Sequence, residues 1–153
     1  MRLPTDECPS AEAVCRREGY RTPPDVDALF DAVEREVGKS AKSHRLVTVV
    51  DWRRCPVMSP AAAARIADRI VLNNGRTERS AALARSNSPV AVLQFLRVIR
   101  EAGLADRKLY FAAGKLVEWL SAVLTGAECR RLKEFVAEAP PCSIERGLES
   151  WRP

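Results

Sequence analysis

The sequence predicts a single α/β domain with a mainly parallel sheet of four to five strands and helices packed on it. Three short apolar segments without helical periodicity, at 46–52, 79–85 and 107–113, are each followed by a longer segment with helical periodicity. Near-continuous apolar strands that alternate with helices are typical of parallel sheets whose two faces are both covered. A length of 153 residues fits one such domain.

The starts of the predicted helices are marked by local capping signals. Ser59 and Ser88 each place a hydroxyl at the N-cap, directly before a proline at the first helical position. Thr125 and Glu128 have the spacing of a capping box. The predicted helices span 24–37, 60–72, 88–102 and 126–138.

The two ends of the chain are less regular. We expect the α/β domain to occupy 23–139, with an N-terminal segment at 1–22 and a C-terminal tail at 140–153. The segment at 13–20 is too charged for a central strand, so it is predicted as an edge strand.

Composition limits the class of protein. The chain is 46% hydrophobic, its apolar stretches are too short to cross a bilayer, and its N-terminus lacks the apolar core of a signal peptide. We therefore expect a cytoplasmic protein without a membrane span. Five cysteines without a CxxC pair and a single histidine predict reduced thiols, no metal site and no cofactor.

The net charge of +5 comes from the centre of the chain, since residues 46–103 hold 9 basic and 4 acidic side chains. These arginines are scattered at helical spacing among acids, and no nucleic-acid-binding motif accompanies them. We expect no nucleic-acid partner.

Asp51 ends the first predicted strand and admits four interpretations: a phosphoacceptor, a metal ligand, a hinge of a regulatory loop, or a turn residue. The favoured one is that its carboxylate accepts hydrogen bonds from the following loop or pairs with Arg53 or Arg54. A carboxylate among arginines is ionised and is therefore a poor general acid.

The stretch 46–120 resembles STAS-like domains of the SpoIIAA-like (STAS/SEC14) group. The likeness rests on the Asp-containing loop VVDWRRCPVMS, the helix PAAAARIADRI, the strand RSAALA, and KLYFAAGKLVEWL, with its aromatic strand and its Trp-Leu helix. The resemblance implies a parallel α/β fold and a non-enzymatic regulator that binds another protein. The SEC14 half of the group implies the alternative, a carrier or sensor of a small apolar or lipid-like ligand, held between the sheet and the helix at 88–102.

In STAS-like antagonists of anti-sigma factors, a partner kinase phosphorylates a serine at the start of the helix after the Asp-bearing strand. Counted from Asp51, that position falls on Pro60 in this chain. Ser59 would be the phosphorylated residue only if the alignment of this loop with the family's motif is shifted by one position.

Three other chemistries are weaker. Asp51, Ser86 and Lys115 follow successive strands as in response-regulator receivers, but the acidic pair that holds Mg²⁺ is missing. Cys55 lies near two arginines that favour a thiolate, although a structural thiol is the plainer interpretation. Motifs of the common hydrolases and nucleotide-binding enzymes are absent from the sequence, so we expect no enzymatic activity.

The helix at 88–102 has two neighbouring apolar faces, one more than contact with a sheet needs. Val92, Leu93, Leu96 and Ile99 form the face expected on the sheet. The second face is expected either to be covered by the helix at 126–138 or to form a homodimer seam. The seam residues are Ala91, Phe95 and Val98.

The expected partner-binding surface lies at strand ends and the loops that follow them, where open parallel sheets bind ligands. The candidate residues are Asp51, Trp52, Arg53, Arg54, Ser59, Asn73, Asn74, Arg76 and Arg79.

Overall fold

The computed structural model describes residues 22–38 and 46–137, and these form a parallel sheet with helices on both faces. The strands are β1 (Leu46–Asp51), β2 (Thr77–Leu83) and β3 (Arg107–Tyr110), in the order β1-β2-β3, and both pairs are parallel. The predicted α/β class is confirmed. The described sheet has three strands, not the predicted four to five, and the edge strand predicted at 13–20 lies outside the described residues.

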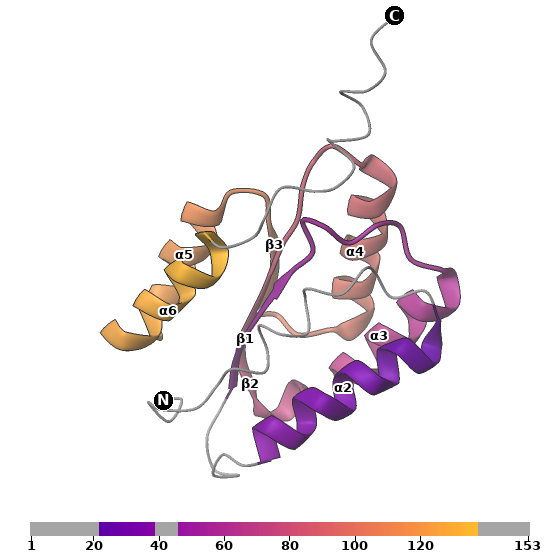
Figure 1. Ribbon diagram of the computed structural model, residues 1–153, viewed down its shortest axis with the longest axis horizontal. Coiled ribbons are helices and arrows are strands. Elements are labelled where there is room, and N and C mark those ends of the chain that lie inside the picture. The colour runs from indigo at the N-terminus through magenta and orange to yellow at the C-terminus, as the bar shows by residue number, and fades with distance from the viewer. Residues whose placement is uncertain (1–21, 39–45, 138–153) are drawn as a thin grey trace, which may run out of the picture.

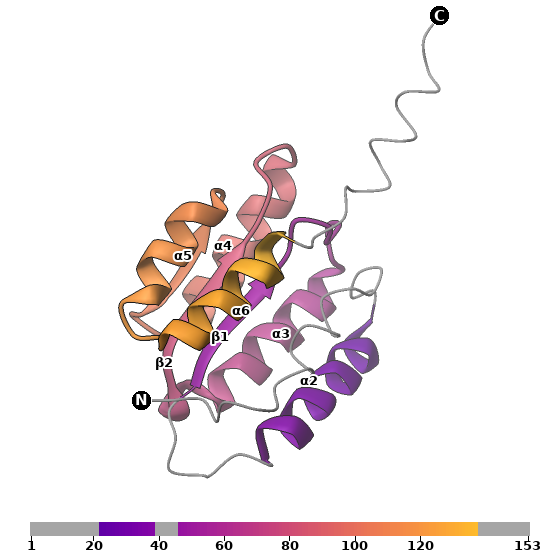
Figure 2. The ribbon, with the colours of Figure 1, turned by 60° about the vertical axis from the view of Figure 1, so that its left-hand side comes forward.

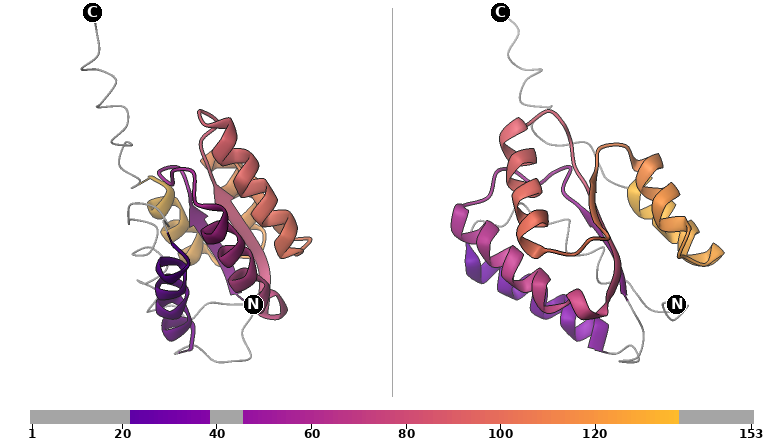
Figure 3. Two further views of the ribbon diagram at one scale, coloured as in Figure 1. Left: turned by 90° about the vertical axis from the view of Figure 1, so that its right-hand side faces the viewer. Right: turned by 180° about the vertical axis from the view of Figure 1, so that it is seen from behind.

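Residues 22–38 and 46–137 contain five helices, and Figure 1 shows how they are arranged about the sheet. The crossover helices α3 and α4 cover one face, and α5 and α6 cover the other, as Figure 3 shows from behind. Helix α2 lies against the outer side of α3 (Figure 2). The helices are α2 (Pro23–Gly38), α3 (Pro60–Leu72), α4 (Pro89–Ala102), α5 (Ala113–Ser121) and α6 (Gly126–Ala137), with a short 3-10 turn η1 (Asn74–Arg76).

The predicted helix starts are confirmed by their caps. The Oγ atoms of Ser59 and Ser88 each accept a hydrogen bond from a backbone N–H in the first turn, at 3.1 and 3.4 Å. Thr125 and Glu128 form the reciprocal bonds of a capping box. These signals are local, so they could be recognised from the sequence alone.

Each strand has a boundary that differs from the prediction. Strand β1 ends at Asp51 and not at 52, and β2 ends at Leu83 and not at 85. Strand β2 begins at Thr77, two residues early, because η1 returns the chain directly to the sheet and the Thr77 hydroxyl donates to the carbonyl of Asn73. Leu46 pairs with Thr77 and Val47 pairs with Arg79, so the register shifts at Glu78. Strand β3 ends at Tyr110 and not at 113, since α5 starts at 113.

Two apolar clusters lie on opposite faces of the sheet. The cluster beneath α3 and α4 is centred on Trp52 and Phe95, whose rings stack with centroids 4.6 Å apart. The cluster beneath α5 and α6 contains Leu83, Leu116 and Leu120.

The predicted roles of the two apolar faces of α4 are reversed in the structure. Ala91, Phe95 and Val98 are buried, with exposed fractions of 4%, 1% and 1%, inside the cluster that α4 shares with the sheet and α3. They are therefore not available as a homodimer seam, and α6 does not cover them, because it packs on the other face of the sheet. Leu93 and Leu96, expected against the sheet, face outward. Periodicity fixes the two faces but not which one turns inward.

Candidate functional site

Asp51 lies at the carboxyl end of β1 and is held by Arg53. The Nη2 and Nε atoms of Arg53 donate to the two carboxylate oxygens at 2.7 and 2.9 Å, and the backbone N–H of Arg53 donates to Oδ1 at 3.0 Å. This is the turn and ion-pair arrangement favoured from the sequence. Both oxygens are engaged and the Asp51 side chain is only 10% exposed, which leaves little of the carboxylate for a phosphoryl group or a metal.

Arg53 also joins this loop to the opposite layer of the protein. Its Nη2 donates to the carbonyl oxygen of Val136, in the last turn of α6, at 2.8 Å. The last carbonyls of a helix lack partners within the helix and attract cations. Arg53 therefore links the end of β1 to α6, and a partner that bound its guanidinium would have to break these hydrogen bonds.

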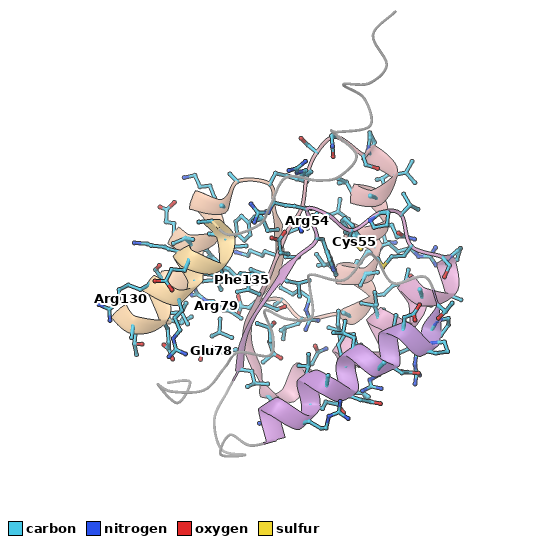
Figure 4. All side chains as sticks on the ribbon, viewed as in Figure 1. Arg54, Cys55, Glu78, Arg79, Arg130 and Phe135 are labelled. Carbon is cyan, nitrogen blue, oxygen red and sulfur yellow. The ribbon has the colours of Figure 1, made fainter. Side chains whose placement is uncertain are left out.

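Trp52 and Ser59 are also committed to structure. Trp52 was predicted to belong to the partner-binding surface. It is only 5% exposed and stacks on Phe95, so it lies in the core. Ser59 caps α3, which is the role expected of it without phosphorylation. Arg54 and Cys55 are half-buried in the same loop, at the carboxyl end of β1 (Figure 4).

The other predicted site residues lie at the opposite end of the sheet. Asn73, Asn74 and Arg76 come after α3 and before β2, and therefore at the amino ends of the strands. Asp51 pairs with Leu83 at the carboxyl end, and Figure 4 shows Arg54 and Cys55 far along β1 from Glu78 and Arg79. The prediction of one surface for all these residues is wrong.

At this amino end, Asn74 and Arg79 have structural contacts. The amide of Asn74 donates to the carbonyl of Ala102 at 2.6 Å and ties η1 to the end of α4. The guanidinium of Arg79 lies 4.8 Å from the Trp119 ring centroid and donates to the Trp119 carbonyl. Lys108 lies over the same indole at 4.7 Å.

The receiver-like set does not form a site with free groups. The Asp51 carboxylate is bound by Arg53, Ser86 is exposed, and the Lys115 ammonium lies 3.2 Å from Glu118 on the surface of α5. These contacts match the interpretation of Lys115 as an exposed residue of the first helical turn.

Arg107 was not singled out from the sequence, yet it is the most unusual charge in the described residues. It is 7% exposed, and its Nε and Nη1 are buried without a hydrogen-bond partner in that part of the chain. Burial lowers the pKa of its guanidinium to about 10. The sequence carried a signal in the charged pair Arg107-Lys108 at the start of a strand that ends in Leu109 and Tyr110.

A second feature missed from the sequence joins the loop after β1 to α4. The side-chain amide of Gln94 donates to the carbonyl of Met58 and accepts from its N–H, both at 2.8 Å. These two hydrogen bonds tie Met58, the residue after Val57, to α4. We call the resulting surface the carboxyl-edge patch. It consists of Val57, Val90, Leu93 and Leu96, which are 50%, 63%, 67% and 45% exposed.

The space between the sheet and α4, where a lipid-like ligand was expected, is filled by side chains. Trp52 and Phe95 stack there, with Ala82, Ala84 and Ala91 packed around them.

Within residues 22–38 and 46–137, the acidic, cysteine and histidine side chains form no group of three able to hold a metal ion. None of the helices in this part of the chain has the length and apolar content needed to span a membrane. No family model matches the chain, and neither a curated protein nor a solved structure matches it.

Proposed function

We propose that this chain is a STAS-like regulatory domain of the bacterial cytoplasm that acts by binding another protein and performs no chemistry of its own. The observation that carries the proposal is the carboxyl-edge patch. Four large apolar side chains, each about half exposed or more, lie on α4 and on the loop that Gln94 ties to it. Grouped exposed apolar side chains mark interaction sites, whereas single ones are ordinary.

The polar residues of the loop support a binding role over a catalytic one. Asp51 is held on both oxygens by Arg53, and Ser59 is a helix cap. A general acid or nucleophile needs a partner that activates it and space for a substrate. Here the same groups fix the shape of the loop that presents Val57.

Affinity capture from a lysate of the source organism, with the purified protein as bait, tests the proposal. The bait variant Leu93→Asp places a charge in the centre of the patch. Leu72→Asp is the matched control, because Leu72 is 73% exposed at the end of α3, outside the patch. Both changes are at exposed positions, and we expect each to alter stability by less than about 1 kcal/mol.

We expect wild-type protein and Leu72→Asp to retain the same partner, and Leu93→Asp to lose it. If both variants retain it equally, or if wild-type protein retains nothing above the resin control, the proposal is wrong.

A further inference from the structure

We infer that the carboxyl-edge patch receives an amphipathic helix of a partner protein, antiparallel to α4 and carrying acidic residues in its first turn. This inference rests on the proposed function and specifies the chemistry of the partner. It comes from the order of apolar and charged residues along the outer face of α4, together with the direction of that helix.

The outer face of α4 changes character along its length. Leu93, Leu96, Arg97 and Arg100 occupy positions i, i+3, i+4 and i+7, which lie on one side of a helix. The amino-terminal half of this side is apolar and is extended by Val90, three residues before Leu93. The carboxyl-terminal half carries the two arginines.

The two arginines differ in availability. Arg97 lies 2.7 Å from Glu101, an exposed pair one turn apart that contributes little and is easily exchanged. Arg100 is exposed and has no hydrogen bond or ion pair in the described part of the chain. A partner carboxylate near Arg100 would therefore gain a cation without breaking an existing ion pair.

The direction of the bound helix follows from the same arrangement. Acidic residues are most favourable in the first turn of a helix, where its dipole is positive. The last turn of α4 has the opposite polarity and carries Arg100. An antiparallel partner helix brings its acidic first turn to this end and its following apolar turns to Leu93 and Val90. Antiparallel alignment also opposes the two helix dipoles.

A second copy of this chain does not fit the same requirements. In an antiparallel pair of α4 helices, Arg100 would face the first turn of the other α4, which contains no acidic residue. In a parallel pair, Arg100 would face Arg100 of the other copy. The antiparallel arrangement leaves the cation without a carboxylate, and the parallel one places two like charges opposite each other.

Two designed peptides test the inference by fluorescence anisotropy. Both are 18 residues long, with identical composition and leucines on one face. One has three glutamates in the first turn, and the other has them in the last turn. We expect the first peptide to bind about three- to tenfold more tightly, since ion pairs at the rim of an interface are individually weak.

The variants separate the contributions. Arg100→Gln should remove the difference between the peptides, whereas Arg35→Gln, an exposed arginine on α2, should preserve it. Leu93→Asp should abolish the binding of both. Equal binding of the two peptides to wild-type protein, or loss of both to the same extent in Arg100→Gln, would contradict the inferred orientation.

Other occupants give different results. Flotation with anionic phospholipid vesicles that depends on Leu93 and Arg100 would assign the patch to a membrane surface. A dimer in light scattering that Leu93→Asp converts to a monomer would assign it to a second copy. Either result would contradict the inference that the patch binds an acidic amphipathic helix. If the lysate partner needs Leu93 but neither peptide binds, the proposed function stands and this inference fails.

Discussion

Replacing Arg107 by methionine should make the protein more stable, although it removes a charged residue from the start of β3. The guanidinium is buried, and its Nε and Nη1 lack partners in the described chain. An unsatisfied buried donor costs about 1–3 kcal/mol. Methionine retains an unbranched apolar chain and has no hydrogen-bond donor, so most of the packing should survive in Arg107→Met.

The lowered pKa gives a second magnitude. The lowering of the pKa of the Arg107 guanidinium to about 10 corresponds to a stability loss on the order of 3 kcal/mol from keeping the buried group charged. The folded pKa lies below the unfolded one, so the unfolded chain holds the proton more tightly. The cost of Arg107 is therefore complete at neutral pH, and it declines only as the pH rises above about 10, towards the higher pKa of the unfolded chain.

Urea unfolding followed by circular dichroism at pH 7 measures the difference. We expect the free energy of unfolding of Arg107→Met to be about 2–3 kcal/mol higher than that of wild-type protein. This corresponds to a Tm higher by about 4–12 °C for a chain of this size. The gain should be constant from pH 6 to 9.

Arg79→Met is the matched control on the neighbouring strand. The Arg79 guanidinium binds the Trp119 carbonyl and lies over its indole, so this variant should lose about 1–2 kcal/mol. The reasoning is refuted if Arg107→Met is less stable than wild-type protein, because the guanidinium would then have a favourable partner in solution.

Three further predictions concern packing, the α2 contact and the loop. Phe95→Ala should cost about 3–5 kcal/mol in urea unfolding, since the ring is 1% exposed and stacks on Trp52. Arg69→Ala should lower hydrogen-exchange protection in α2 more than in the sheet, because Arg69 binds three α2 carboxylates, including that of Asp27. Arg65 and Arg69 lower the pKa of Asp27, so this contact is complete above pH about 4 and weakens as the carboxylate is protonated in stronger acid. Gln94→Leu should increase amide exchange in the loop after β1 and leave α6 unchanged.

The sequence was informative where structure depends on neighbouring residues. The caps at Ser59, Ser88 and Thr125 fixed the helix starts, because each cap needs only a side chain and the backbone of the next turn. Alternation of apolar segments gave the parallel sheet. The charged pair Glu78-Arg79 hid the start of β2, since its place in the sheet depends on pairing with β1.

The candidate site was harder to predict because it depends on contacts between distant segments. Asn73, Asn74 and Arg76 were grouped with Asp51, although residues between a helix and the next strand lie at the amino edge of a parallel sheet. The bond of Gln94 to Met58 joins positions 36 residues apart and has no local signal.

The two hydrogen bonds between Gln94 and Met58 hold the loop after β1 against α4, next to the stacked rings of Trp52 and Phe95. Trp52 stacks on Phe95 of the same helix that carries Leu93 and Leu96, on the side away from solvent. Fluorescence of Trp52, followed in a protein whose other tryptophans are replaced, therefore tests whether binding at the outer face of α4 reaches the core.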